Sequence, residues 1–525
     1  MHARPAPTAR TGNPHGSQPG TDSPERRTTR SQATVSRARA SSARQNRLIG
    51  VRPDSWTVWL GGLDRQGLLE ELLAEDVIAR ALREAPTGHR YDRVLTAKMT
   101  AVCVLVACLF PGDGYRAVLA RAFGLPGLRF KPGTEVPADS AFSQARRLLG
   151  EQAMRKIFEL DAARSDAELG ITALWKGLEV TAIDGTTMEL FRNDVLACEF
   201  GTPAEGARPL LRIAAHVPTA SRRWTGAGIG GYHDGENDLA DRLEWSFGPG
   251  MLNLADRGFF STDRFLRFSA RGADLAWRVK NGAKCVPFKT VRELPDGSGL
   301  VMLHESGGMR TRRRRQTGNR HAPRLPDTMA RLVTFTITAQ TRSGRAKAAQ
   351  IRVLTTLLDH QTFPAREIAA LYAERWQAEI AFLHLKKTVR GPRRALRGQS
   401  PALARQEAWA LLLIHNIVAT ATARAAAEEG TDPWLIPFTA VLSLVRAHVA
   451  ADTRCRHCGH RPTRPDAPLD GLTSAIIALP RHRQGRQRTS GRTAAERRTG
   501  HTEEVTYTID ITKSNPPKWD TVPET

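Results

Sequence analysis

The chain has 525 residues, of which 41% are hydrophobic, and its 77 Lys and Arg against 53 Asp and Glu give a formal net charge of +24. That apolar content excludes wholesale disorder, the longest strongly apolar run (101–110) is too short for a membrane span of about 20 residues, and the six cysteines show no disulfide framework. The length suggests two to four domains, and the charge favours a polyanion such as nucleic acid as the partner without naming any chemistry.

The first predicted elements are a tail and a helical domain. Residues 1–53 are rich in Arg, Ser, Thr, Pro and Gly without an apolar period, which predicts a disordered basic tail, either a solvated leader or an arm that touches DNA. Residues 54–170 have apolar side chains at helical spacing and predict an all-helical N-terminal domain. Its helices are expected over 96–110, 117–123 and 140–149.

Strands are expected from residue 171 onward. The segment from about 283 to 350 is β-prone and turn-rich, and it contains a basic loop at Arg310–Arg315. A long helix is predicted from Pro364 through Arg390. The short apolar runs that predict strands are 178–183, 210–217, 251–255, 276–279 and 351–358.

Strands followed by helices, with a β segment inserted between them, indicate an α/β catalytic domain. We place this domain at 171–430. A helical region is predicted over 431–480, and a flexible basic tail over 481–525.

Two of the predicted strands end in aspartate. Asp184 follows an apolar run and precedes Gly185, and Asp256 follows another and precedes Arg257. The carboxyl edge of an α/β sheet is where chemistry usually lies. One such Asp is more commonly a helix cap or an Asx-turn, whereas two in the same setting favour a shared site.

A third carboxylate lies on the long predicted helix. Its polar face is expected to be opposite an apolar face formed by Ile380, Ala381 and Leu383. The simpler interpretation of the polar face is a solvated stripe with one i,i+4 ion pair. Four residues at spacings of 3, 4 and 7 form that polar face: Tyr372, Arg375, Glu379 and Lys386.

Asp184, Asp256 and Glu379 together suit a different role. Carboxylate oxygens are hard ligands for Mg²⁺ or Mn²⁺. Two such ions can activate a water or hydroxyl and stabilise the leaving oxygen in phosphodiester transfer. Cations beside such a cluster can hold DNA phosphates.

With these residues in place, the sequence resembles transposases of the bacterial IS4 family, which are DDE recombinases with an RNase H-like catalytic core. The likeness rests on the helix signature Tyr-x2-Arg-x3-Glu-x6-Lys, on the segments 183–186 and 255–259, and on the long gap between Asp256 and Glu379. The resemblance implies an RNase H-like mixed sheet flanked by helices, an inserted β-rich subdomain and an all-helical, DNA-binding N-terminal domain.

The resemblance also implies a role for each residue of the motif. Asp184, Asp256 and Glu379 would bind two Mg²⁺ or Mn²⁺ ions and catalyse the reaction. No Trp lies between Trp277 and Trp376, which leaves open whether the second DNA strand is cut through a hairpin. The implied DNA contacts are Tyr372, Arg375, Trp376, Lys386 and Arg278.

A member of this family would bind the terminal inverted repeats of an insertion sequence and catalyse metal-dependent DNA cleavage and strand transfer. Its partners would be double-stranded DNA and a second copy in a synaptic complex, in the cytoplasm on the nucleoid and away from membranes. Two alternatives stay open: a DDE-derived nuclease without transposition, and an inactive DNA-binding relict. Cys455 and Cys458 resemble half of a zinc site, with an Arg/His-rich linker as the alternative.

Overall fold

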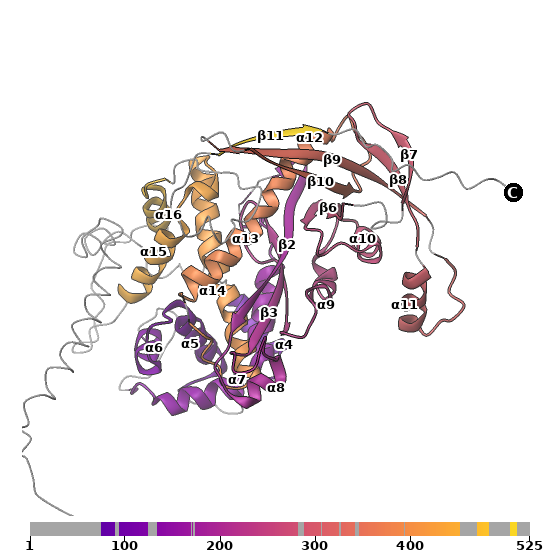
Figure 1. The fold of residues 1–525 in the computed structure, drawn as a ribbon. Coiled ribbons are helices and arrows are strands. Elements are labelled where there is room, and N and C mark those ends of the chain that lie inside the picture. The colour runs from indigo at the N-terminus through magenta and orange to yellow at the C-terminus, as the bar shows by residue number, and fades with distance from the viewer. Residues whose placement is uncertain are drawn as a thin grey trace, which may run out of the picture. The chain divides into compact units, whose positions relative to one another are not determined.

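A mixed sheet with helices packed around it dominates the described chain (Figure 1). All described residues belong to one compact unit, Leu63–Thr525. The predicted tail 1–53 and the Cys455–Cys458 motif lie outside the described residues. The computed structural model describes residues 75–89, 94–123, 134–169, 171, 174–281, 288–305, 307–324, 327–341, 346–392, 394–451, 470–481 and 505–511.

The described residues contain eleven strands, and all of them join the same sheet. They are β1 (Leu174–Trp175), β2 (Leu178–Glu189), β3 (Leu210–Pro218), β4 (Gly226–Gly231), β5 (Met251–Ala255), β6 (Asp274–Val279), β7 (Phe288–Glu293), β8 (Gly299–Leu303), β9 (Thr328–Thr341), β10 (Ala346–Thr355) and β11 (Val505–Ile511).

The strand order is β4-β3-β2-β5-β6-β10-β9-β8-β7, with β1 beside β2 and β11 beside β9. β5 is parallel to both of its neighbours, β2 and β6, and the other pairs are antiparallel. This confirms the predicted mixed sheet. The two parallel pairs matter most for function, because they bring the carboxyl ends of β2 and β5 to the same edge.

β4 escaped prediction because its sequence is mostly glycine, which is normally depleted in strands. Here glycine allows other backbone segments to approach closely. A Cβ on Gly228 would lie 2.8 Å from the Leu239 carbonyl oxygen, and one on Gly231 would lie 2.6 Å from the Phe200 carbonyl oxygen. The missing side chains therefore let two helices pack directly against this strand.

The β-rich insertion extends the catalytic sheet. β10 pairs with β6, with Thr355 opposite Ala276, and β9, β8 and β7 follow outward. Val301 and Leu332 of the insertion belong to the same buried cluster as Ile183 of β2. The insertion is thus built onto the core that supports β2 and β5.

Two expectations for basic segments are wrong. The expected loop at Arg310–Arg315 is helix α11 (Gly307–Thr317), which fits the high helix propensity of arginine. The predicted flexible tail 481–525 contains β11, which pairs with β9 and places Ile509 opposite Ile337. The alternation of β-branched and aromatic residues in β11 is typical of a strand.

A long apolar helix, α14, packs against α5, α7, α15 and α16. The predicted helix at 96–110 is confirmed as α5, capped by Thr96, whose side chain accepts the Met99 N–H. The predicted helix at 140–149 continues as α7 past a bend at Gly150. The helices are α4 (Glu75–Glu84), α5 (Ala97–Leu109), α6 (Tyr115–Ala122), α7 (Asp139–Ala162), α8 (Asp194–Phe200), α9 (Glu236–Asp241), α10 (Thr262–Ser269), α11, α12 (Ala365–Tyr372), α13 (Trp376–Leu383), α14 (Pro401–Glu429), α15 (Phe438–Ala451) and α16 (Asp470–Ile477).

Buried polar contacts join the N-terminal helices to the catalytic domain. Arg146 Nε of α7 donates to Gln406 Oε1 of α14 at 3.0 Å. Asn416 of α14 donates to Asp161 of α7 at 2.8 Å, and Asp161 also pairs with the fully buried Arg223. Because unpaired buried charges are costly, these contacts hold α7, α14 and the sheet in one arrangement.

Among the described helices, α14 is the one long and apolar enough to cross a membrane by length and composition. Of its most apolar window, 89% is buried inside the molecule. That burial is what a core helix of a globular protein shows.

Candidate active site

Asp184 and Asp256 lie next to each other at the end of one parallel ladder. The last residue pair of the β2–β5 ladder is Ile183 opposite Ala255, and each aspartate is the next residue along the chain, Asp184 within β2 and Asp256 directly after β5. Neighbouring strands lie about 4.8 Å apart. The structure therefore brings the first two predicted carboxylates together.

Asp184 is not at the end of its strand, which corrects the expectation from sequence. β2 continues to Glu189, and Asp184 lies opposite Ala215 of β3. The residues after Asp184 resemble a turn in sequence, but β3 provides hydrogen-bond partners for them. Asp184 is consequently half-buried in the middle of a paired strand.

A buried polar network fixes the register of β2 against β5. Thr181 lies opposite Asn253, and Asn253 Nδ2 donates to Thr181 Oγ1 at 3.0 Å. Trp277 Nε1 donates to Asn253 Oδ1 at 3.0 Å, and His216 Nε2 lies 2.8 Å from Thr181 Oγ1. A slip of one residue would break these buried hydrogen bonds, so the network keeps the two aspartates adjacent.

Glu379 comes from the helical run that follows β10. α12, a 3₁₀ turn (Ala373–Arg375), α13 and a π-helical segment (His384–Val389) follow one another without interruption. The predicted long helix is present, but its winding changes before and after Glu379. Because a π-helix has more residues per turn, simple α-helical spacing does not place Lys386 on the Glu379 face.

The expected apolar face of this helix is also partly wrong. Leu383 is 53% exposed, and Ile380 is only half-buried. Ala381 is buried as expected, and the rest of the buried side is formed by Ala378, Phe382 and Leu385. The irregular winding rotates the apolar stripe away from the position that a uniform helix would give it.

Two arginines pair with two of the three carboxylates. Arg375 Nη2 donates to Glu379 Oε1 at 2.8 Å, as the simpler interpretation of the helix expected. Arg278 Nη1 of β6 donates to Asp256 Oδ1 at 3.4 Å. Both arginines were predicted to contact DNA, and in this structure both lie on predicted catalytic carboxylates.

The other three predicted DNA contacts lie in different settings. Tyr372 is buried, and its hydroxyl donates to the Ala255 carbonyl at 3.2 Å, which ties the helix to the end of β5. Lys386 Nζ donates to the Thr186 hydroxyl at 3.0 Å. Trp376 is half-buried at the start of α13. Their contacts with DNA stay predictions.

A fourth carboxylate, which sequence reasoning missed, lies beside the two aspartates. Glu236 begins α9, and its side chain lies so close over Gly185 that a Cβ there would overlap Glu236 Oε1. In the sequence, Glu236 does not directly follow an apolar run that predicts a strand, and it is not part of the helix signature that contains Glu379. The glycine directly after Asp184 was a sign of close packing, but the sequence could not name the group packed against it.

Burial shifts the pKa of two of these carboxylates, Asp184 and Glu236. Burial raises the pKa of Asp184 to about 7, and Glu379 and Glu236 add to the rise, while the Gly185 N–H and Arg375 oppose it. Burial also raises the pKa of Glu236, with Asp256 adding to the rise and Arg212 opposing it. Within the described residues, Asp184 and Glu236 have no arginine ion pair, and burial disfavours the charged form of each.

These carboxylates suit a divalent metal in their ligand chemistry and in their location at the end of the β2–β5 ladder. Its ligands are hard carboxylate oxygens, and a bound cation would neutralise the negative charge that burial makes costly. In the described part of the chain, no three His, Cys, Asp or Glu side chains lie close enough together to hold a metal ion as they stand. The fit is therefore one of ligand type and position.

Two family models match the chain. The N-terminal region of insertion element 4 transposases matches residues 64–159, and the transposase DDE domain matches residues 175–417. The transposase InsG for insertion sequence element IS4 of Escherichia coli (strain K12) is 30% identical over 363 residues, which cover 67% of this chain and 75% of InsG. A piggyBac transposase, solved by cryo-electron microscopy in a synaptic complex with hairpin DNA, is 9% identical with a TM-score of 0.38, over 78% of this chain and 85% of that chain.

Proposed function

The chain belongs to the IS4 family of DDE transposases, and from this premise we propose which residues carry out its reaction and on what substrate. Asp184, Asp256 and Glu379 are the catalytic carboxylates. The substrate is double-stranded DNA at the ends of an insertion sequence, which the protein cleaves and then joins to target DNA. The adjacency of Asp184 and Asp256 at the end of the β2–β5 ladder is the observation that carries this proposal.

The proposed cofactor is a pair of Mg²⁺ or Mn²⁺ ions. When bound, such ions supply charge stabilisation and a reactive oxygen nucleophile for phosphodiester cleavage. Asp184, Asp256 and Glu379 would hold them, and Glu236 adds a fourth carboxylate beside them. The raised pKa of Asp184 supports this, because a partly buried carboxylate beside other carboxylates gains most from a neighbouring cation.

Arg278 and Arg375 are proposed to change partners during the reaction. Each pairs with a catalytic carboxylate in this structure, at 3.4 Å from Asp256 and 2.8 Å from Glu379. With cations held by those carboxylates, the guanidinium groups of Arg278 and Arg375 would be available to bind the DNA phosphates. Tyr372 positions Arg375 by holding the helix against Ala255.

The proposed DNA partner also explains the distribution of positive charge. In α11, Arg313 and Arg314 are tied to Glu305 and to the Ala322 carbonyl, whereas Arg312 and Arg315 are exposed. The net charge of +24 would supply salt-sensitive, sequence-independent attraction to DNA. We further propose that two copies join the two element ends in a synaptic complex, on the nucleoid in the cytoplasm.

The experiment that tests this function is product analysis on a labelled duplex that carries the element's terminal sequence. Metal-dependent nicking at the element end distinguishes an enzyme from an inactive relict. Joining of the released 3′ end to a second duplex distinguishes a transposase from a nuclease. A protein that binds the duplex but forms neither product would overturn the proposal.

A further inference from the structure

Arg390 has a guanidinium group that calls for an acceptor outside the described chain. Its Nε and Nη1 atoms are buried and donate no hydrogen bond within the described residues. Buried polar atoms nearly always have a hydrogen-bond partner, and buried arginines are nearly always paired. An exception of this kind, directly after the helical run that carries Glu379, points to a ligand.

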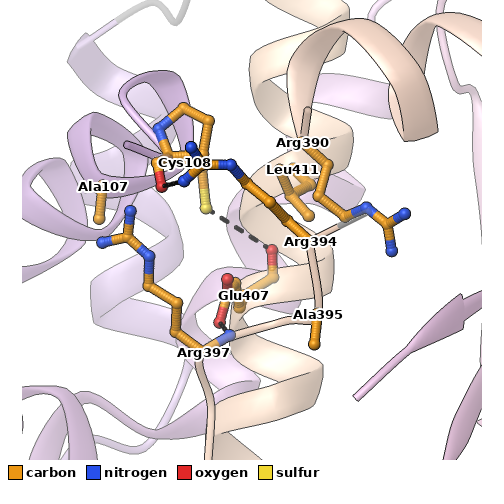
Figure 2. A pocket seen from close by; sticks show the side chains of 9 residues that line it. Ala107, Cys108, Arg390, Arg394, Ala395, Arg397, Glu407 and Leu411 are labelled. Carbon is orange, nitrogen blue, oxygen red and sulfur yellow. Dashed lines mark hydrogen bonds between the residues drawn. The ribbon is translucent and has the colours of Figure 1, made fainter. Parts of the chain in front are cut away.

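The arginines next to Arg390 have different environments. Arg390, Arg394 and Arg397 line a pocket of about 180 Å³ whose other wall includes Cys108 and Glu407 (Figure 2). Arg394 donates to the Pro111 carbonyl, and Arg397 Nη2 donates to the Phe110 carbonyl at 3.3 Å. These two arginines therefore bind the backbone just beyond the C-terminal end of α5, which a helix dipole favours.

Arg390 is turned the other way. Figure 2 shows its guanidinium pointing away from Cys108 and from Arg397. The chain after Arg390 is fixed by Glu407, whose Oε2 accepts the N–H groups of Arg397 and Gly398 at 2.8 and 2.9 Å. Arg390 is thus presented from an anchored segment without being part of the anchor.

A second cation, Lys386, lies close to Arg390 in the π-helical segment. Its Nζ donates to the neutral hydroxyl of Thr186, two residues beyond Asp184 on β2. Burial lowers the pKa of Lys386, and the charge of Arg390 lowers it further. Burial thus disfavours the charge of both cations, and the charge of Arg390 further disfavours that of Lys386.

No carboxylate in the described chain neutralises this pair by an ion pair. Glu189 is close enough to favour both charges, but it is exposed, and its ion-pair partner is Arg208 at 3.9 Å. The charge of Glu407 also favours charged Arg390, but the Glu407 carboxylate forms no ion pair with it, and its Oε2 accepts two backbone N–H groups. Two neighbouring cations with neutral or missing partners are a suitable arrangement for an anion.

We propose that Lys386 and Arg390 together hold one backbone phosphate of the bound DNA strand, other than the phosphate being cleaved. A guanidinium can offer two parallel N–H groups to a phosphate, and an ammonium adds a point charge. Thr186 links Lys386 to β2, the β-strand that carries Asp184. The phosphate contact would therefore set the position of the DNA strand relative to the catalytic carboxylates. The inference rests on the proposed function and adds Arg390 to it as a positioning residue.

The test is DNA binding by the full chain without divalent metal, so that no cleavage occurs. Fluorescence anisotropy with an end-containing duplex is measured over a range of salt concentrations. Arg390→Gln is expected to weaken binding about tenfold and to reduce the slope of log K against log salt by about one, as loss of one phosphate contact predicts. Arg366→Gln, which changes an exposed arginine of α12 in the same helical run, is the matched control and should leave both quantities unchanged.

A methylphosphonate scan then locates the phosphate. Each backbone phosphate is replaced singly by the neutral methylphosphonate, and binding is compared between the wild type and Arg390→Gln. At one position, the methylphosphonate is expected to weaken binding by the wild type about tenfold. The same replacement should weaken binding by Arg390→Gln less than about twofold, because that variant has already lost the contact. If Arg390→Gln unfolds at the assay temperature, Arg390→Lys is used in its place. Its DNA affinity is expected to be about threefold lower than that of the wild type, and the methylphosphonate scan should show an altered response only at the same phosphate position.

The proposal is overturned if Arg390→Gln keeps the wild-type affinity and salt slope. It is also overturned if every methylphosphonate weakens binding by the wild type and by Arg390→Gln to the same extent. Those results would leave the transposase function intact. A wild-type protein that binds the duplex without salt dependence would instead contradict the proposed function itself.

Discussion

Asp184 directly follows Ile183 and Asp256 directly follows Ala255, and Ile183 and Ala255 lie opposite each other in the parallel ladder between β2 and β5. The position of one catalytic candidate relative to the other is therefore set by strand register. Thr181 and Asn253, which are also opposed in this ladder, hold that register through buried hydrogen bonds. The active-site geometry thus depends on a polar network three residues away from the carboxylates.

We expect Asn253→Leu to lower the free energy of unfolding by about 2–3 kcal/mol. The change leaves the buried Trp277 Nε1 without its acceptor and Thr181 Oγ1 without the amide donor. Urea denaturation followed by tryptophan fluorescence measures the effect. Unchanged stability in Asn253→Leu would show that the network does not hold the strands together.

Glu236→Gln is predicted to weaken Mn²⁺ binding by about tenfold, within the range found for groups that support a metal site. Glu236 lies against Gly185 and raises the pKa of Asp184, so its charge forms part of the field that a cation would enter. Electron paramagnetic resonance titration of free Mn²⁺ gives the affinity without any catalytic turnover. Asp238→Asn, an exposed acid in the same helix, is the control, and equal effects of the two variants would refute a specific role for Glu236.

Asp184→Asn is predicted to stabilise the metal-free protein, and increasingly so as the pH rises from about 4 to about 7. The pKa of Asp184 is raised to about 7 in the folded protein, mainly by burial. In this pH interval the folded state keeps a proton that the unfolded state has released, so the wild type loses stability as pH rises. We expect a difference of about 4 kcal/mol at pH 7.5 and almost none at pH 3.5. A pH-independent difference between the two proteins in urea denaturation would contradict the raised pKa.

The arginines of α11 are predicted to divide into two classes. Replacing the exposed Arg312 and Arg315 by glutamine should lower the salt slope of DNA binding by about two without affecting stability. Arg313→Gln should instead cost about 1–3 kcal/mol of stability, because it removes the 2.9 Å contact of Arg313 Nε with the buried Glu305 carboxylate. Salt-dependent anisotropy and thermal unfolding distinguish the two effects, and the same response in both variants would show that the division is wrong.

Sequence pattern alone predicted the elements that are apolar and locally regular. β5 has the predicted bounds, and α5 begins within one residue of the predicted start of the 96–110 helix. The pattern failed where partners from elsewhere decide the structure. β2 continues past Asp184 because β3 pairs with it, and the glycines of β4 form a strand because helices press against them.

The candidate site was predicted in its members but not in its arrangement. Three carboxylates and the cations around them follow from spacing and family likeness. The pairing of Arg278 with Asp256 requires knowledge that β6 lies beside β5, and the setting of Lys386 depends on a π-helical segment that no periodicity announces. Glu236 reaches the site only through the fold, from a helix that follows a strand on the far side of β3.

The most direct test of the account is the single-turnover cleavage of an end-containing duplex by the wild type and by Asp184→Asn, Asp256→Asn and Glu379→Gln, with and without Mg²⁺ or Mn²⁺. We predict that the wild type cleaves only with a divalent ion. Each variant should lose about 1,000-fold or more in rate, while still binding the duplex. A variant that cleaves at the wild-type rate would contradict the assignment of these carboxylates as the catalytic metal ligands. Cleavage by the wild type in the presence of a chelator would contradict it as well.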